Sequence, residues 1–251
     1  MEDITKAFEF ASKAHGKQKR RIKKAPYIIH PMDVAIILMK NHAPDKVVIA
    51  GLLHDTVEDT KTTIEDIEEN FGKEVARLVK NVTEPAKLEK KKIFSKTQEI
   101  WEEKKTHTIN FIKTADKNTK LLSCADKLSN IRSMIEDEKT IKKEIWDNFH
   151  APKEKQKWYY ESMQKSFATG DNIKDRELFK QFKKSSKDKL IQQSKRALCA
   201  GLKNQSNFTA LKPLRFDACP KNSTVKFRTY LKTSFLIFVR SLCNRECKRN
   251  L

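Results

Sequence analysis

The chain has 251 residues, of which 38% are hydrophobic and 34% are charged, and only five are glycine. A sheet sandwich would need more glycines in its turns, so this composition favours a soluble, helix-rich protein. The formal net charge of +20 is uneven, because residues 168–251 carry 20 Lys and Arg against 6 Asp and Glu. The apolar run Phe235–Val239 is far too short to span a bilayer, as are the runs at 34–39 and 47–53, and we expect no membrane association.

The five cysteines do not have the spacing of a disulfide framework. Only Cys124 lies in the first two thirds of the chain, and no second pair of Cys or His follows Cys243 and Cys247 to complete a zinc site. Met1 is followed by acidic residues and an amphipathic pattern, which is not typical of a signal peptide. We therefore expect a reduced protein of the cytoplasm.

Apolar residues recur at helical spacing through most of the first 167 residues, without strand alternation or an internal repeat. Pro31 suits the first turn of a helix, and Thr63 with Asp66 resembles a weak capping box. In chain order, the pattern predicts helices over about 4–15, 31–41, 45–55, 63–72, 73–82, 98–114 and 119–135.

Two domains are expected from the change in composition along the chain. Residues 1–167 should form an all-α bundle, with a loop at the lysine-rich segment 84–97 and an aromatic segment at 146–160 that packs back on the helices. In residues 168–251, Lys, Ser, Asn and Gln dominate, which favours a basic, poorly ordered extension. The alternative is a tail that binds nucleic acid or another anionic surface.

Four ionisable groups follow the apolar, uncharged run at residues 47–53. These are His54 and Asp55, and then Glu58 and Asp59, each four residues further on. If the helix continues that far, residues four apart share a face and all four groups can converge. Burying such a cluster without a cation would be costly, so a metal site is one interpretation. A solvated helix end with an acidic cap is the other.

Two further positions extend this possible site. His30 stands before Pro31, which would hold its imidazole at a helix N-terminus, although a single His there is more often structural. Asp126 borders an apolar stripe and needs either a cation or a basic neighbour, for which Lys127 and Arg132 are available. Two His with two Asp form a mixed nitrogen and oxygen set that suits Mn²⁺ or Fe²⁺ better than Zn²⁺.

Five sequence blocks occur in a fixed order between residues 3 and 165. The blocks are His15-x-x-Gln18-x-Arg20, Pro26-Tyr27-Ile28-x-His30-Pro31, Leu52-Leu53-His54-Asp55-x-x-Glu58-Asp59-Thr60, Phe71-Gly72 and Ala125-Asp126-Lys127-Leu128-x-Asn130-Ile131-Arg132. Together they resemble the hydrolase domain of the RelA/SpoT enzymes and their small standalone relatives, within the HD-domain superfamily of metal-dependent phosphohydrolases. The resemblance implies a compact all-α HD-domain bundle. It also implies removal of the 3′-pyrophosphate from guanosine tetraphosphate, usually with Mn²⁺.

Carried over residue by residue, the resemblance implies metal ligands, residues that act on the attacking water, and residues that meet the substrate. The implied metal ligands are His30, His54, Asp55 and Asp126. The residues that would position or activate the water are Glu58 and Asp59. The implied substrate-binding residues are Arg20, Lys23, Lys24 and Asn130. For the three basic residues the alternative is a solvated turn, and Asn130 could instead order the metal shell.

The implied reaction is hydrolysis of guanosine 3′,5′-bis(diphosphate) to GDP and pyrophosphate with Mn²⁺ or another divalent metal. Lys17 stands where the family usually has Gly, and the turn at residues 21–25 has no glycine, so a different pocket wall and nucleotide are open alternatives. One rival is an HD-type phosphatase of another nucleotide or a phosphorylated cofactor. Another is a metal-stabilised nucleic-acid-binding protein without turnover. The sequence leaves the oligomeric state open.

Overall fold

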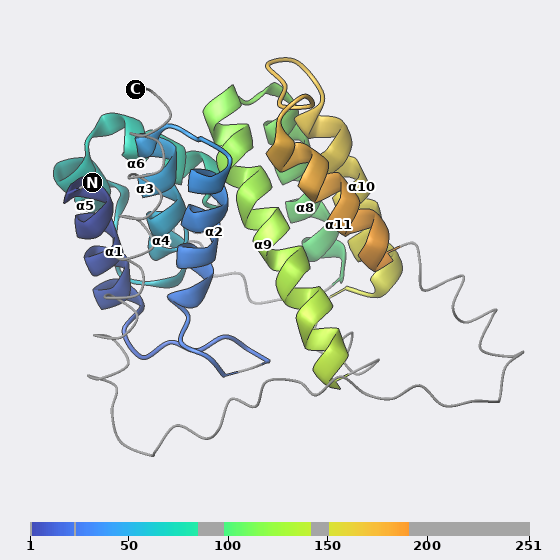
Figure 1. Ribbon diagram of the computed structural model, residues 1–251, viewed down its shortest axis with the longest axis horizontal. Coiled ribbons are helices and arrows are strands. Elements are labelled where there is room, and N and C mark those ends of the chain that lie inside the picture. The colour runs from blue at the N-terminus through green and yellow to red at the C-terminus, as the bar shows by residue number, and fades with distance from the viewer. Residues whose placement is uncertain (1, 23, 85–97, 142–150, 191–251) are drawn as a thin grey trace, which may run out of the picture. The chain divides into compact units, whose positions relative to one another are not determined.

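A computed structural model describes residues 2–22, 24–84, 98–141 and 151–190 of the chain. Within these ranges the regular structure is helical, and the β contact is an isolated bridge between Lys19 and Pro26 (Figure 1). This confirms the all-α fold class. The described helices belong to a compact unit that runs from Met1 to Gln192. The predicted loop at 85–97, and the part of the basic extension after 190, lie outside the described residues.

The described helices follow the expected order, with one break that the sequence pattern does not reveal. The apolar run ends at Leu53, and a turn at His54 and Asp55 separates it from a short helix, so the continuous helix expected over 45–55 is wrong at its end. The bounds are α1 (Glu2–His15), α2 (Ile29–Lys40), α3 (Asp45–Leu53), α4 (Thr56–Asp59), α5 (Ile64–Phe71), α6 (Lys73–Val82), α8 (Gln98–Thr114), α9 (Lys117–Ile141), α10 (Lys153–Phe167) and α11 (Glu177–Leu190).

Helix α3 lies at the centre of the N-terminal helices. Its residues from Val47 to Leu53 are all buried, and α1, α2, α6 and α9 pack around it. Helix α2 packs closely on Gly51: a Cβ atom there would lie 2.7 Å from Leu38 Cδ1 and 3.3 Å from Val34 Cγ1, so a larger residue would force these side chains to shift. Burial of each large aliphatic side chain here contributes about 1.5–3 kcal/mol. Tight packing therefore fixes the position at which α3 ends.

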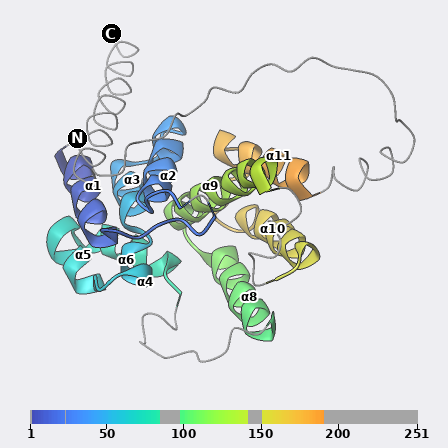
Figure 2. The same ribbon diagram turned by 90° about the horizontal axis from the view of Figure 1, so that it is seen from below.

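Helix α9 joins two groups of helices. It contacts α2, α3 and α6, and it also contacts α11. Figures 1 and 2 show α9 between the N-terminal helices and the group formed by α8, α10 and α11. Its apolar side chains Leu122, Leu128 and Ile131 are fully buried. Helix α9 can therefore contribute some residues to the packing with the N-terminal helices and others to the cavity described below.

Helix α11 extends the packed unit beyond residue 167, where the composition indicated a domain boundary. Leu178, Phe179 and Phe182 are buried, and the Phe182 ring lies 5.4 Å from that of Phe167 on α10. The segment has an amphipathic pattern, but its many lysines and serines make its overall composition resemble that of the basic extension.

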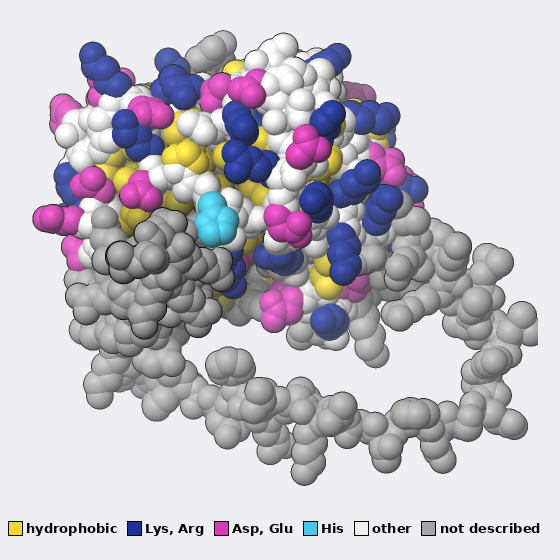
Figure 3. Space-filling model, turned by 45° about the horizontal axis from the view of Figure 1, so that its top comes forward, with side chains coloured by type: hydrophobic (Ala, Val, Ile, Leu, Met, Phe, Trp, Pro, Cys, Tyr) yellow, Lys and Arg dark blue, Asp and Glu magenta, His cyan; other side chains and the backbone are white. Residues whose placement is uncertain are grey.

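The surface of the described residues is mixed in charge. Figure 3 shows Lys and Arg side chains interspersed with Asp and Glu on one face, with hydrophobic atoms between them. Among the described helices, none combines the length and the hydrophobicity needed to cross a bilayer.

Asp116 caps the N-terminus of α9. Its Oδ1 accepts hydrogen bonds from the backbone N–H groups of Asn118 and Thr119, at 3.0 and 3.1 Å. Its Oδ2 accepts a hydrogen bond of 2.8 Å from the Arg77 guanidinium on α6. Burial alone would raise the pKa of Asp116, but the hydrogen bonds from Arg77 and Thr119 lower it to about 2. Asp116 thus stabilises the start of α9 and links it to α6.

We expect Asp116→Ala to lower the free energy of unfolding by about 1 kcal/mol at pH 7. Because folding lowers the pKa of Asp116, its contribution is complete above the unfolded pKa of about 4 and is lost as the pH falls towards about 2. Urea unfolding between pH 7 and pH 3 measures this difference. Asp116→Asn keeps the capping oxygen and is the control. A difference from wild type that stays constant over this range would contradict the assignment.

Candidate metal centre and its cavity

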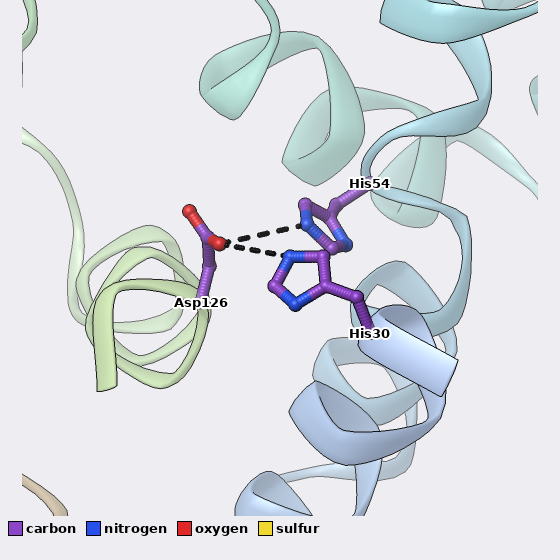
Figure 4. A group of neighbouring side chains, drawn as sticks. All are labelled: His30, His54 and Asp126. Atoms are coloured by element: carbon purple, nitrogen blue, oxygen red, sulfur yellow. Dashed lines mark ion pairs between the residues drawn. The ribbon is translucent and has the colours of Figure 1, made fainter. Parts of the chain in front are cut away.

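Two imidazoles and two carboxylates converge between α2, α9 and the turn after α3. The Nε2 atom of His30 lies 3.2 Å from Asp126 Oδ1, and Nε2 of His54 lies 3.8 Å from the same oxygen. The Asp55 carboxylate lies 3.1 Å from His54 Nε2 through Oδ1 and 3.6 Å from His30 Nε2 through Oδ2. Figure 4 shows His30, His54 and Asp126 facing one another. The structure thus brings together the four residues that the sequence suggested as ligands.

The breaks between helices determine how these groups meet. His30 is in the first turn of α2, where Pro31 follows it. His54 and Asp55 occupy the turn between α3 and α4. Asp126 is in the interior of α9, on the side that packs towards α2 and α3. The site therefore depends on the packing of three helices and not on the face of one.

The hydrogen bond of His54 leaves one ring nitrogen available to a cation. Nδ1 lies 2.8 Å from the carbonyl oxygen of Gly51, which can only accept, so Nδ1 carries the proton. Nε2 of the neutral ring then has a lone pair directed into the site. This buried atom has no hydrogen-bond partner among the described residues. Because an unpartnered buried nitrogen is costly, a metal ion fits this position.

The electrostatic field at the site favours positive charge. Burial lowers the pKa of His54, but the Asp55 and Asp126 carboxylates outweigh it and the net shift is upward. Burial alone would raise the pKa of Asp126, yet Lys127 and the two histidines hold it well below its usual range. The pKa of Asp55 is also lowered, by His54 and His30, against the effect of burial. Both carboxylates are therefore anionic near neutral pH and can balance a cation.

A second layer of side chains orients the carboxylates and the His30 ring. Tyr27 donates a hydrogen bond of 2.7 Å to Asp55 Oδ2, and Ser129 Oγ lies 3.0 Å from His30 Nδ1. Asn130 donates a bond of 2.6 Å to Asp126 Oδ1, the oxygen that faces the histidines. Such contacts fix the direction of the ligands. Asn130 thus lies where it can order the shell.

Lys127 occupies the other side of Asp126. Its ammonium lies 2.5 Å from Asp126 Oδ2. Burial would lower the pKa of Lys127, but Asp126 raises it strongly. The basic neighbour considered from the sequence is therefore present in addition to the histidines. It balances one oxygen of Asp126, while Oδ1 stays directed at the ring nitrogens.

Glu58 and Asp59 lie on α4, next to the four converging groups. The backbone N–H of Glu84, two residues after the end of α6, donates to Glu58 Oε2 at 3.3 Å. Burial raises the pKa of Glu58, and the charges of Asp55 and Asp59 raise it further. Asp59 is exposed and lines the adjoining cavity. The pair thus combines a carboxylate of raised proton affinity with one that reaches solvent.

The block that contains His15 and Gln18 contacts residues next to the four converging groups. The His15 ring stacks on Tyr27 with a centroid separation of 4.8 Å, and its Nδ1 lies 2.8 Å from Gln18 Oε1. Gln18 in turn donates a hydrogen bond of 2.7 Å to the backbone oxygen of Asp59. These contacts connect the block to both Asp55, through Tyr27, and α4. Its role is to hold neighbouring residues in place.

A cavity of about 750 Å³ opens beside the four groups. Arg20 lines it, and its guanidinium lies 5.8 Å from the centre of the Tyr27 ring. Lys24 is exposed on the same loop and is not among the described residues that line the cavity. The third basic residue predicted there, Lys23, lies outside the described residues. The volume is in the range of small-molecule sites.

The cavity is also lined by residues from two sequence blocks, at 101–105 and 158–160, that differ from those of the best-studied relatives but were given no individual role. Trp101 and Lys105 come from α8, and Tyr159 comes from α10. The spacing of four residues between Trp101 and Lys105 was the available signal, since it places both on one helix face. Their contact with Tyr159 depends on tertiary packing and could not be inferred from that spacing.

We expect Mn²⁺ to stabilise the protein through the four converging groups. At a free Mn²⁺ concentration one hundred times Kd, the free energy of unfolding should rise by about 2.7 kcal/mol, and EDTA should reverse the rise. His54→Gln should abolish this increase, whereas the same substitution at the exposed His107 should preserve it. Chemical unfolding with and without Mn²⁺ measures both. An equal increase in His54→Gln and wild type would show that Mn²⁺ binds elsewhere.

Comparison with known proteins identifies the family to which this fold belongs. A family model described as HD domain matches residues 7–151. The guanosine-3′,5′-bis(diphosphate) 3′-pyrophosphohydrolase of Aquifex aeolicus is 39% identical over 156 residues, which are 60% of this chain and 21% of that protein. The human 3′-pyrophosphohydrolase MESH1 is 37% identical over 134 residues, which are 52% of this chain and 69% of MESH1. The chain thus spans about a fifth of the length of the long bacterial relative.

Two solved structures share the fold. A crystal structure from Listeria monocytogenes is 36% identical, with a TM-score of 0.54 over 63% of this chain and 96% of the other. A metazoan ortholog of SpoT that hydrolyses ppGpp is 26% identical, with a TM-score of 0.57 over 75% of this chain and 96% of the other. These matches confirm the resemblance that the five sequence blocks indicated. The chain belongs to the HD-domain family.

Proposed function

We propose that this protein is a metal-dependent pyrophosphohydrolase that converts guanosine 3′,5′-bis(diphosphate) into GDP and pyrophosphate. The observation that carries this proposal is the convergence of two buried imidazole nitrogens and two carboxylates beside a nucleotide-sized cavity. The names of the relatives from Aquifex and human, both 3′-pyrophosphohydrolases, support the substrate.

His30, His54, Asp55 and Asp126 would hold the metal ion in this proposal. Their mixed nitrogen and oxygen atoms favour Mn²⁺, although other divalent ions can use such a set. A bound divalent ion would supply a Lewis acid for a phosphoryl oxygen and would make the attacking water more acidic. Nε2 of His54, which has no hydrogen-bond partner among the described residues, supports the presence of such an ion.

Glu58 is proposed as the general base. It takes a proton from water, the water oxygen bonds to the phosphorus attached to O3′, and the bond between that phosphorus and O3′ breaks. O3′ takes up a proton and becomes the 3′-hydroxyl of GDP, while the released pyrophosphate carries the oxygen of water. Burial and neighbouring charges raise the pKa of Glu58, which makes its carboxylate a stronger base. Asp59 would orient the water from the cavity side.

The loop before α2 is proposed to meet the guanine base and the phosphates. Arg20 lines the cavity, and a hydrogen bond of 2.8 Å from its backbone N–H to Ala25 closes the loop around it. A guanidinium can pair with phosphate oxygens or stack on a base. We assign the same partners to Lys24 and to Lys23. Asn130 would act through Asp126 and contact the nucleotide.

We also propose that the enzyme acts in the cytoplasm. Cys124, within the part of the chain that the structure describes, is a free thiol buried on α9. A reduced thiol suits a compartment in which disulfides are rare.

The first test is release of pyrophosphate from guanosine 3′,5′-bis(diphosphate) by the Mn²⁺-loaded protein. We expect turnover by wild type and none by Asp55→Ala. Glu58→Gln should lower kcat by about 10²- to 10⁴-fold, because it removes the base but preserves the shape of the side chain. No release from a folded, metal-binding wild type would exclude this substrate. Nucleoside monophosphates and phosphorylated cofactors are the comparison panel for the rival phosphatase.

The pH profile tests the role of Glu58 separately. A base must be deprotonated to act, so kcat should rise with pH as Glu58 ionises. Because the pKa of Glu58 is raised, this acidic limb should lie above the usual range of a glutamate. The limb should be absent from the residual activity of Glu58→Gln. Its persistence in that variant would assign the base to another group.

A further inference from the structure

Lys105 is held between two aromatic rings in the wall of the cavity. Its Nζ lies 5.9 Å from the centre of the Trp101 ring and 5.1 Å from that of Tyr159. The two rings lie 6.2 Å apart at 70°, so they form an angled frame around the ammonium. Attraction between a cation and aromatic faces fixes the position of the charge without neutralising it. Lys105 is therefore a charge held in place at the cavity.

Among the described residues, Lys105 also differs from the lysines near it because no carboxylate is paired with it. Lys104 pairs with Glu84 at 2.5 Å, and Lys155 of α10 pairs with Glu102 at 2.7 Å. Within the described ranges, no Asp or Glu oxygen lies within ion-pair distance of Lys105. A partly buried ammonium without an internal anion favours an anionic ligand.

A second polar group at the same wall lacks a partner. The side chain of Tyr159 is only 3% exposed, and its hydroxyl has no hydrogen-bond partner among the described residues. A buried hydroxyl without a partner is costly, and an anionic oxygen would accept its proton in a hydrogen bond. The ammonium and the hydroxyl are thus two independent indications of a ligand with several hydrogen-bond acceptors.

The wall that contains Lys105 continues to the metal centre. The Tyr159 ring lies 5.4 Å from that of Tyr160, and both tyrosines line the same cavity as Lys127. Lys127 is paired with Asp126, one of the proposed metal ligands. Lys105 and the metal centre therefore belong to one site, and a single ligand can meet both.

We propose that Lys105, with Trp101 and Tyr159, binds the 5′-diphosphate of the substrate while the 3′-diphosphate lies at the metal centre. This rests on the proposed function, and it adds a residue that determines specificity. A nucleoside with diphosphates on both O3′ and O5′ has two anionic groups separated by a ribose. The metal ion that the four ligands would hold can match the 3′-diphosphate. Among the other cations that line the cavity, which include Arg20, Arg21 and Arg132, Lys105 is held between two aromatic rings and can match the 5′-diphosphate. The enzyme should therefore discriminate against nucleotides that lack the 5′-phosphates.

Binding of GDP and guanosine to the Mn²⁺-loaded full chain tests this proposal without requiring turnover. GDP has the 5′-diphosphate but no bond to be hydrolysed at O3′. Calorimetric titration of Lys105→Met should show GDP binding weakened by about 10- to 100-fold, and guanosine binding changed by less than about threefold. Lys105→Arg, which keeps the charge, should retain most of the affinity for GDP.

Lys113→Met is the matched control, because Lys113 is an exposed lysine on the same helix. It should bind both ligands as wild type does. Equal weakening of GDP and guanosine in Lys105→Met would show that Lys105 contacts the nucleoside, and would overturn the proposal. Unchanged GDP binding, or no GDP binding by wild type, would overturn it as well.

Measurements of turnover distinguish a failure of this inference from a failure of the proposed function. In Lys105→Met, kcat/KM should fall at least about tenfold for guanosine 3′,5′-bis(diphosphate) and stay near wild type for guanosine 3′-diphosphate. If wild type hydrolyses neither compound while GDP binding depends on Lys105, the proposed reaction is wrong and the 5′-diphosphate site stands. If wild type is active and Lys105→Met loses both substrates equally, the reaction stands and the inference fails.

Discussion

Two carboxylates and two imidazoles surround one point in the interior of this protein, and their desolvation is the constraint on which the rest of the structure depends. The Nε2 atom of His54 is buried there without a hydrogen-bond partner among the described residues, between Asp55 and Asp126. Such an arrangement is costly unless a positive charge is present. Lys127 supplies part of that charge. The surrounding helices hold the two carboxylates close together although they repel each other.

Helix packing holds the groups in place. The buried helix α3 ends at Leu53, just before His54, and α2 packs closely on it at Gly51. Helix α9 contacts both α2 and α3, and it brings Asp126 opposite the two histidines. The same helix continues towards α8, α10 and α11. One packed framework thus positions both the metal centre and the cavity beside it.

Much of the site could be predicted from the sequence, because the ligands stand in motifs with fixed spacing. The motifs identified His30 and Asp126 as ligands of one site, although they are 96 positions apart in the sequence. The break after Leu53 was missed, because the apolar run gives no signal that the helix stops before His54 and Asp55. Helix α11 was not assigned, although helical spacing continues to about residue 198, because lysines and serines dominate the composition of that segment. The wall formed by α8 and α10 depends on contacts between distant segments, which periodicity cannot reveal.

The most direct test of the account is hydrolysis of guanosine 3′,5′-bis(diphosphate) in ¹⁸O-labelled water by the Mn²⁺-loaded protein, with the products analysed by mass spectrometry. Attack of water on the phosphorus attached to O3′ predicts the label in pyrophosphate and none in GDP. Label in GDP, release of inorganic phosphate as the primary product, or no turnover at all would contradict the account.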